Sequence, residues 1–225
     1  MKEILEYLSA LEQNNNRDWY HDHKAQYQAA NENFLGIIQD LIIQIGRNDS
    51  AILHNNPKEL TFRLTRDTRF SNDKSPYNPA FRAHIAARGK LPVPVGYYIV
   101  IRPDNRSFLG GGLFADMFKD ATAMVRDAII KDSNEWESII TNPAFREFFE
   151  VKGNALKNVP RGYDAEHPQA EYLKNKSWYL EHPIMDEQLL QDDFVETAAG
   201  IYAVMQPFNQ FLNHALAAFE MPSRP

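Results

Sequence analysis

The sequence predicts an α+β fold, in which an antiparallel β-meander over about residues 60–110 packs against a long N-terminal helix and several C-terminal helices. Apolar residues recur at helical spacing before residue 46 and after residue 114, whereas they alternate with polar residues in between. Helices and strands therefore come in separate blocks, without the βαβ alternation of a parallel sheet, and this order is typical of α+β proteins. We expect residues 1–225 to form a single domain.

The N-terminal block predicts two helices. Ile4, Leu5, Leu8 and Leu11 indicate a short amphipathic helix. A longer helix over roughly residues 17–45 is indicated by an apolar stripe made of Phe34, Ile37, Ile38, Leu41, Ile42 and Ile45. Asn16 suits the N-cap of this helix, and Gly46 suits its C-terminal stop.

Four segments of the middle block are predicted to be strands: LTFRLTRD, FRAHIAAR, GYYIVIRP and RSFLGG. If the apolar face of the first two packs on the long helix, Arg63, Arg82 and His84 stand together on the other face. A solvated, charged face of an antiparallel sheet would give the same pattern. The sequence alone leaves both interpretations open.

The C-terminal block predicts further helices. Pro143 after Asn142 is suited to the first turn of one of them. The last helix carries apolar residues from Phe194 to Leu212, and Pro207 is expected to kink it or to divide it in two.

Composition limits the possible functions. The 225 residues carry a formal net charge of -6, which argues against general nucleic-acid binding. Charges interrupt the apolar residues near the start, and no apolar run approaches the ~20 residues of a membrane span. We therefore expect a cytoplasmic protein without a membrane-spanning segment.

No metal or cofactor is expected. The chain has no cysteine, which excludes cysteine zinc sites and iron–sulfur clusters. His21 and His23 are two positions apart on a predicted helix, so their side chains do not converge on one ion.

The segment RLTRDTRFSNDKSPY concentrates the chemically informative side chains. Arginine forks suit the bidentate capture of carboxylate or phosphate. We predict that Asp67 and Asp73 pair with cations or cap backbone N–H groups, which would organise this loop. The candidate ligand-binding residues in and beside the segment are Arg63, Arg66, Arg69, Lys74, Tyr77, Arg82 and His84.

A second basic loop, LKNVPRGYDAEHP, is also stiffened by proline. We predict that Lys157 and Arg161 of this loop join Arg66, Arg69 and Lys74 around one anion-attracting site. The alternative is that each loop packs on the helix nearest to it.

The segment RDTRFSNDKSPYN resembles the signature of a widespread family catalogued as domain of unknown function 2461. The resemblance extends to NNNRDWYHDHKAQY, GGGLF and LKNVPRGYDAEHP, and it covers about residues 4–215. It implies no activity, cofactor or catalytic residue.

Two functions from different classes follow. In the first, the cluster of arginine, lysine and tyrosine binds a small anionic ligand that bears phosphate or carboxylate, and enzymatic activity is left open. In the second, the protein is a non-enzymatic interaction module that docks through a charged sheet face. A nuclease-like site of Asp67, Asp73 and His84 around a divalent metal is disfavoured, because neighbouring arginines would neutralise the carboxylates.

Overall fold

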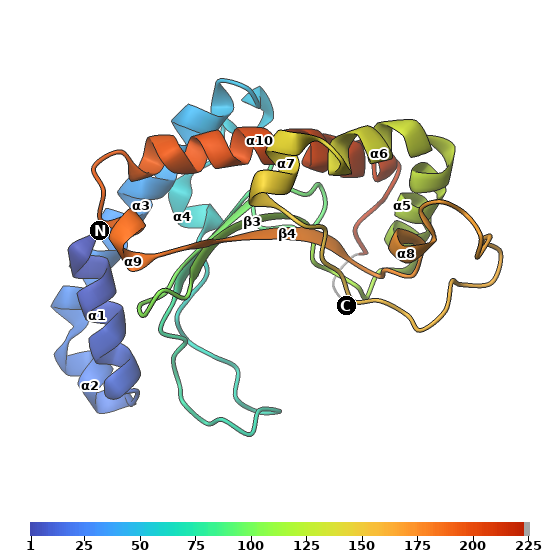
Figure 1. Ribbon diagram of the computed structural model, residues 1–225. Helices are drawn as coiled ribbons and strands as arrows, with labels where there is room; N and C mark the ends of the chain where they lie inside the picture. The colour runs from blue at the N-terminus through green and yellow to red at the C-terminus, as the bar shows by residue number, and fades with distance from the viewer. Residues whose placement is uncertain (223–225) are drawn as a thin grey trace. The chain divides into compact units, whose positions relative to one another are not determined.

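A computed structural model describes residues 1–222 of the protein, and Figure 1 shows its helices and strands. The strands are β1 (Phe81–Ile85), β2 (Tyr97–Ile101), β3 (Ser107–Leu113) and β4 (Trp178–Ile184). The helices are α1 (Lys2–Gln13), α2 (Arg17–Asp22), α3 (Lys24–Gly46), α4 (Pro57–Leu60), α5 (Lys119–Lys131), α6 (Ser133–Ile140), α7 (Pro143–Phe148), α8 (Ala170–Leu173), α9 (Asp186–Leu189) and α10 (Phe194–Ala215), with a 3-10 turn at Ser50–Ile52.

None of the helices in residues 1–222 combines the length and the apolar character that crossing a membrane requires.

The predicted N-terminal helices are present, with one break. The long helix expected over residues 17–45 is divided at His23 into α2 and α3. Asn16 caps α2 as predicted, because its Oδ1 accepts a hydrogen bond from the backbone N of Trp19 at 2.9 Å. At the break, the His23 ring stacks on Trp19 with 4.0 Å between centroids, and its Nδ1 lies 2.8 Å from Trp19 O. The His23 side chain thus binds the carbonyl end of α2 where the helix stops.

The four strands form an antiparallel sheet in the order β1-β2-β3-β4, which confirms the predicted α+β class. Three of the four strands lie where the meander was predicted. The turn between β2 and β3 places Asp104 and Asn105 at φ of 65° and 57°. Positive φ at both central residues is the geometry of a type I′ hairpin turn, and Asp and Asn tolerate it better than most residues.

The first predicted strand, LTFRLTRD, is wrong as a continuous strand. This segment makes only isolated bridges, from Thr61 to Ala83 and from Thr65 to Tyr77. Pro76 and Pro79 lie in the stretch that faces it, and proline has no N–H to donate to a ladder. The segment is therefore extended and paired at a few points, and it leads into the arginine-rich loop.

The fourth strand, β4, was missed by the sequence analysis. Its sequence WYLEHPI mixes apolar residues with charged ones. It also contains Pro183, and a proline argues against a central strand because it has no backbone N–H to donate. β4 is the last strand in the sheet order, where a proline costs no inner hydrogen bond. Of the two outcomes expected at Pro207, the division of the last helix is wrong, because α10 continues through this residue. A kink at Pro207 stays a prediction.

The chain divides into two compact units by its internal contacts. Unit 1 comprises residues 1–85, 98–109 and 183–200, and unit 2 comprises residues 86–97, 110–182 and the chain from residue 201. In unit 1, α1 packs along α3 (Figure 1). Phe34 of α3 stacks on Phe81 of β1 with 5.2 Å between ring centroids. This contact confirms that the meander packs on the long helix. In unit 2, Trp136 contacts Phe208 and Phe211 of α10.

We expect Ile38→Asp to lower the free energy of unfolding by several kcal/mol, because Ile38 is fully buried on α3 and the new carboxylate would have no partner. Ile43→Asp, on the same helix but 48% exposed, is the matched control and should cost less than about 1 kcal/mol. Urea denaturation of both variants would measure the difference. Equal losses would contradict the packing of this face.

Candidate functional site

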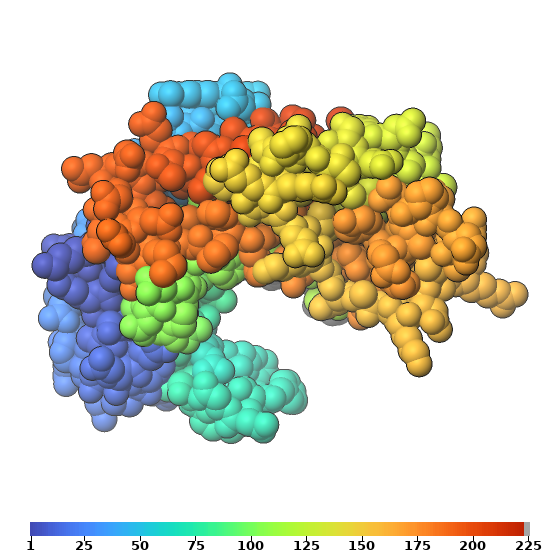
Figure 2. Space-filling model, in the orientation of Figure 1, coloured from blue at the N-terminus to red at the C-terminus, as the bar shows by residue number. Residues whose placement is uncertain are grey.

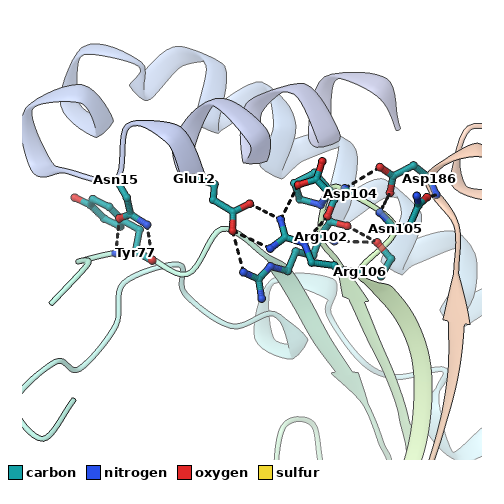
Figure 3. A network of polar contacts seen from close by, with 10 residues as sticks. Glu12, Asn15, Tyr77, Arg102, Asp104, Asn105, Arg106 and Asp186 are labelled. Carbon is teal, nitrogen blue, oxygen red and sulfur yellow. Dashed lines mark hydrogen bonds and ion pairs between the residues drawn. The ribbon is translucent and has the colours of Figure 1, made fainter. Parts of the chain in front are cut away.

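A two-way amide contact joins the two distant segments of unit 1 that carry the arginine-rich motif and the asparagine run. Asn15 Nδ2 donates to Tyr77 O at 2.9 Å, and Tyr77 N donates to Asn15 Oδ1 at 3.1 Å (Figure 3). The Tyr77 ring, which is buried, also stacks on Tyr20 of α2 with 4.3 Å between centroids. Because the NH₂ and the C=O of the Asn15 amide bind the C=O and the N–H of the same residue, the position of Tyr77 relative to the start of α2 is fixed.

The local sequence prepares both sides of this contact. α1 ends at Gln13 and Asn16 caps α2, so Asn15 lies in the short link between two helices. Tyr77 lies between Pro76 and Asn78-Pro79, where the prolines restrict the backbone. Few backbone conformations are therefore lost when the contact forms.

Arg66 and Asp73 close the base of the arginine-rich loop, residues 66–76, which we call the motif loop. Arg66 Nη1 forms an ion pair with Asp73 Oδ2, and Arg66 N donates to Pro76 O at 2.8 Å. Asp73 Oδ1 also accepts a hydrogen bond from Ser75 N at 2.9 Å. The Arg66 guanidinium, followed by the Ser75 amide, holds the pKa of Asp73 well below its usual range. Asp73 is thus a carboxylate at neutral pH.

Asp67 pairs with Arg69 near the tip of the same loop. Arg69 Nε lies 2.9 Å from Asp67 Oδ1, and Arg69 Nη2 lies 2.6 Å from Asp67 Oδ2. The side chains of Asp67 and Asp73 are 57% and 58% exposed. Exposed pairs contribute only about 0–1 kcal/mol each, so these carboxylates shape the loop without adding much stability.

The surface of unit 1 has two neighbouring hollows that share three lining residues, Asn15, Arg66 and Tyr77. The first, the Arg17 hollow, measures about 320 Å³ and is completed by Asn16, Arg17, Thr65, Thr68, Lys74 and Pro76. The second, the Glu12 hollow, measures about 390 Å³ and is completed by Glu12, Asp73, Ser75, Asn78, Pro79 and Arg102. Figure 2 shows the motif loop in teal as a lobe beside the N-terminal helices, drawn in blue.

The two hollows differ in charge. The Arg17 hollow has three cationic side chains, Arg17, Arg66 and Lys74, and no carboxylate among its lining residues. Lys74 Nζ is positioned by a hydrogen bond to Thr68 O at 3.0 Å. The Glu12 hollow sets Arg66 and Arg102 against Glu12 and Asp73. The lining of the Arg17 hollow is therefore more positively charged than that of its neighbour.

Glu12 anchors the β2–β3 hairpin to α1. Its carboxylate accepts hydrogen bonds from Arg102 Nη2 and Arg106 Nη1, each at 2.9 Å, and pairs with Arg106 Nη2 as well (Figure 3). The hydrogen bond from Arg106 is the largest cause that lowers the pKa of Glu12 to about 2. A carboxyl group with so low a pKa is unsuited to general acid–base chemistry near neutral pH, so its role is to hold the two arginines.

The tip of the same hairpin is fixed by Asp186, the first residue of α9. Asp186 Oδ2 accepts from Asp104 N at 2.9 Å, and its Oδ1 accepts from Asn105 N at 3.1 Å. Asn105 Oδ1 in turn accepts from Asp186 N at 2.8 Å. These bonds satisfy the turn amides and keep Arg102 and Arg106 in front of Glu12.

Arg82 and His84 lie outside both hollows, in a different setting from the one expected. The bridge between Thr61 and Ala83 pairs Phe62, rather than Arg63, with Arg82. The Arg82 guanidinium lies 5.5 Å from the centroid of the Phe62 ring, and Arg63 O accepts from Arg82 Nη2 at 3.3 Å. The prediction that Arg63 shares a face with Arg82 and His84 is therefore wrong, because the register differs by one residue.

His84 is buried, and its ring lies 6.1 Å from that of Tyr98. Tyr98 also neighbours Phe62 and Phe108 at 6.0 Å and 6.2 Å. Aromatic rings thus cover much of the sheet face that the sequence suggested would be charged.

Lys157 and Arg161 are exposed and belong to unit 2, whereas Arg66, Arg69 and Lys74 belong to unit 1. Near Arg161, the Tyr163 hydroxyl donates to Asp127 Oδ1 at 2.9 Å within unit 2. The shared site of the two basic loops stays a prediction.

The match to known proteins is at the level of a family. The model described as "Conserved hypothetical protein (DUF2461)" matches residues 3–211. The chain belongs to this family. The resemblance drawn from the motifs is confirmed, and no curated protein or solved structure matches the chain significantly.

The sequence analysis missed Glu12, Asn15, Arg17 and Arg102 as site residues. Asn15 and Arg17 carried a signal, since both lie in the NNNRDWY segment that resembles the family. Glu12 and Arg102 carried none, because a glutamate at the end of an amphipathic helix and an arginine after a strand are common surface residues.

We expect Asn15→Asp to lower the free energy of unfolding by about 1–2 kcal/mol, because aspartate keeps an acceptor for Tyr77 N but faces Tyr77 O with a second acceptor. Asn14→Asp is the control, since the Asn14 amide donates only locally, to Ala10 O at 2.9 Å, and is exposed. Chemical denaturation would compare the two. A larger loss for Asn14→Asp would contradict the importance of the contact.

Glu12 should make a pH-dependent contribution to stability. Its pKa falls from 4.5 to about 2 on folding, so the contribution is complete above about pH 4.5 and is lost as pH falls toward 2. Glu12→Gln should cost about 2 kcal/mol at pH 7. The deficit relative to wild type should shrink when urea denaturation is repeated at pH 3. Glu6→Gln, whose partner Lys2 lies 3.7 Å away in an exposed pair, should show no such trend.

Proposed function

We propose that unit 1 binds a small anionic ligand, bearing phosphate or carboxylate, in the Arg17 hollow. The observation that carries the proposal is the lining of this hollow, which includes Arg17, Arg66 and Lys74 but no carboxylate. The chain as a whole has a net charge of -6, so this local positive charge runs against the overall balance. Guanidinium and ammonium groups form short, charge-assisted hydrogen bonds with such anions.

The fixed geometry around the hollow supports binding rather than chance clustering. Arg17 is placed by the capped start of α2, and Arg66 by its backbone bond to Pro76 O at 2.8 Å. Lys74 is placed by Thr68 O, and the floor is fixed by the contact between Asn15 and Tyr77. Cations held in place before binding lose little side-chain entropy when the ligand arrives.

The proposal is one of binding, and it assigns no catalytic residue. Burial and the neighbouring tyrosines raise the pKa of Tyr20, which stacks on Tyr77, to about 12, so its hydroxyl stays protonated at neutral pH. Asp73 and Glu12 stay ionised because arginines bind them. These groups are suited to positioning rather than to proton transfer.

We expect Arg17→Ala and Lys74→Ala each to weaken the binding of inorganic phosphate by roughly tenfold, because each removes one charge-assisted contact. Arg47→Ala and Lys58→Ala, exposed cations of unit 1 outside the hollow, are the controls and should bind as wild type does. Isothermal titration calorimetry in buffer without sulfate or phosphate would measure the affinities. Indistinguishable binding by all four variants would contradict the site.

Asp73→Asn should tighten phosphate binding several-fold, because the variant removes the carboxylate that neutralises the Arg66 guanidinium. The free energy of unfolding should change little, since the pair is exposed. Asp67→Asn is the matched control, because Asp67 pairs with Arg69, which does not line the hollow. Weaker binding by Asp73→Asn would show that Arg66 serves the loop and not the ligand.

A further inference from the structure

The tip of the motif loop carries an aromatic ring that packs on little else. Phe70 is 96% exposed, more than any other large apolar residue among residues 1–222. The guanidinium of its neighbour Arg69 lies 5.9 Å from the ring centroid. A phenylalanine held almost entirely in water gives up the stabilisation that burial of its ring would bring.

The backbone of Phe70 lies close to a residue that lines the Arg17 hollow. Thr68 lines the hollow, and its carbonyl positions Lys74 at 3.0 Å. Phe70 follows Thr68 by two residues, so their Cα atoms are at most about 7.6 Å apart. One ligand of moderate size can therefore contact the cations of the hollow and the Phe70 ring together.

We infer that the ligand of the Arg17 hollow is a phosphate ester that carries a planar aromatic group, with the phosphate beside Arg17, Arg66 and Lys74 and the planar group stacked on Phe70. The inference rests on the proposed function and adds the class of ligand. A phosphate brings up to two charges and three acceptor oxygens, which match three cations better than a monocarboxylate does. A base stacked on an aromatic side chain contributes about 1–3 kcal/mol, and Arg69 can add a cation–π contact.

Two sources share this chemistry: a free nucleotide, whose base is separated from the phosphate by a sugar, and a phosphorylated tyrosine, whose ring bears the phosphate directly. A long single-stranded nucleic acid fits less well, because the chain as a whole carries a net charge of -6 and polyanions need a broad basic surface.

The experiment compares five probes by calorimetry with the full chain: inorganic phosphate, adenosine monophosphate, ribose 5-phosphate, adenosine and phosphotyrosine. For the wild type, we expect adenosine monophosphate to bind about 5- to 100-fold more tightly than ribose 5-phosphate, which lacks the base. Phe70→Ala should abolish that difference, and Phe70→Trp should keep it. Ile43→Ala, which removes an exposed apolar side chain elsewhere in unit 1, is the control and should behave as wild type.

Equal affinities for adenosine monophosphate and ribose 5-phosphate, together with phosphotyrosine no tighter than inorganic phosphate, would overturn the inference. So would an aromatic preference that survives in Phe70→Ala. A preference for phosphotyrosine that depends on Phe70 would support the inference and assign the phosphorylated side chain as the source. Failure of the proposed function looks different: neither inorganic phosphate nor ribose 5-phosphate would bind, and Arg17→Ala would change nothing.

Discussion

The side-chain amide of Asn15 hydrogen-bonds to both the backbone N–H and the backbone C=O of Tyr77. The geometry of unit 1 around the motif loop depends on this contact. It ties the link between α1 and α2 to the end of the loop, 62 residues away in the sequence. Tyr20 stacks on the ring of the same tyrosine, so the joint combines two directional bonds with aromatic packing. Both hollows include Asn15 and Tyr77 in their lining, and Arg66 faces them from a backbone held by Pro76.

The charged side chains around this joint divide into two groups. Glu12 and Asp73 bind the arginines that organise the hairpin and the motif loop. Asp104 also pairs with Arg106, so the three carboxylates balance the three guanidinium groups. Arg17 and Lys74 contribute charge that no carboxylate in the Arg17 hollow balances. Arg66 belongs to both groups, because it is paired with Asp73 and still lines both hollows. This separation of paired from unpaired charge supports the proposed site over the alternative of a solvated basic loop.

Periodicity was sufficient for the long helices α1, α3 and α10 and for three strands, since the stripe on α3 and the alternation in β1 follow from which residues must be buried. It failed where tertiary pairing decides. Whether Phe62 or Arg63 lies beside Arg82 depends on a register that alternation alone does not fix. β4 was missed because Pro183 is tolerated at the end of the sheet order. Arg66 and Lys74 were recognised by composition, whereas Glu12 and Arg102 become site residues only through folding.

The bonds from Asp186 to the β2–β3 turn have a consequence for how the protein is made. Asp186 lies 81 residues after Asn105, and most of unit 2 is encoded between them. The ribosome therefore synthesises the hairpin and all of residues 110–182 before it adds the side chain that binds the hairpin tip. Closing so long a loop is slow relative to local folding. The N-terminal helices of unit 1 can fold early, but the hairpin tip is completed only after Asp186 has been synthesised. A nascent chain stalled before residue 183 would therefore lack the side chain that binds that turn.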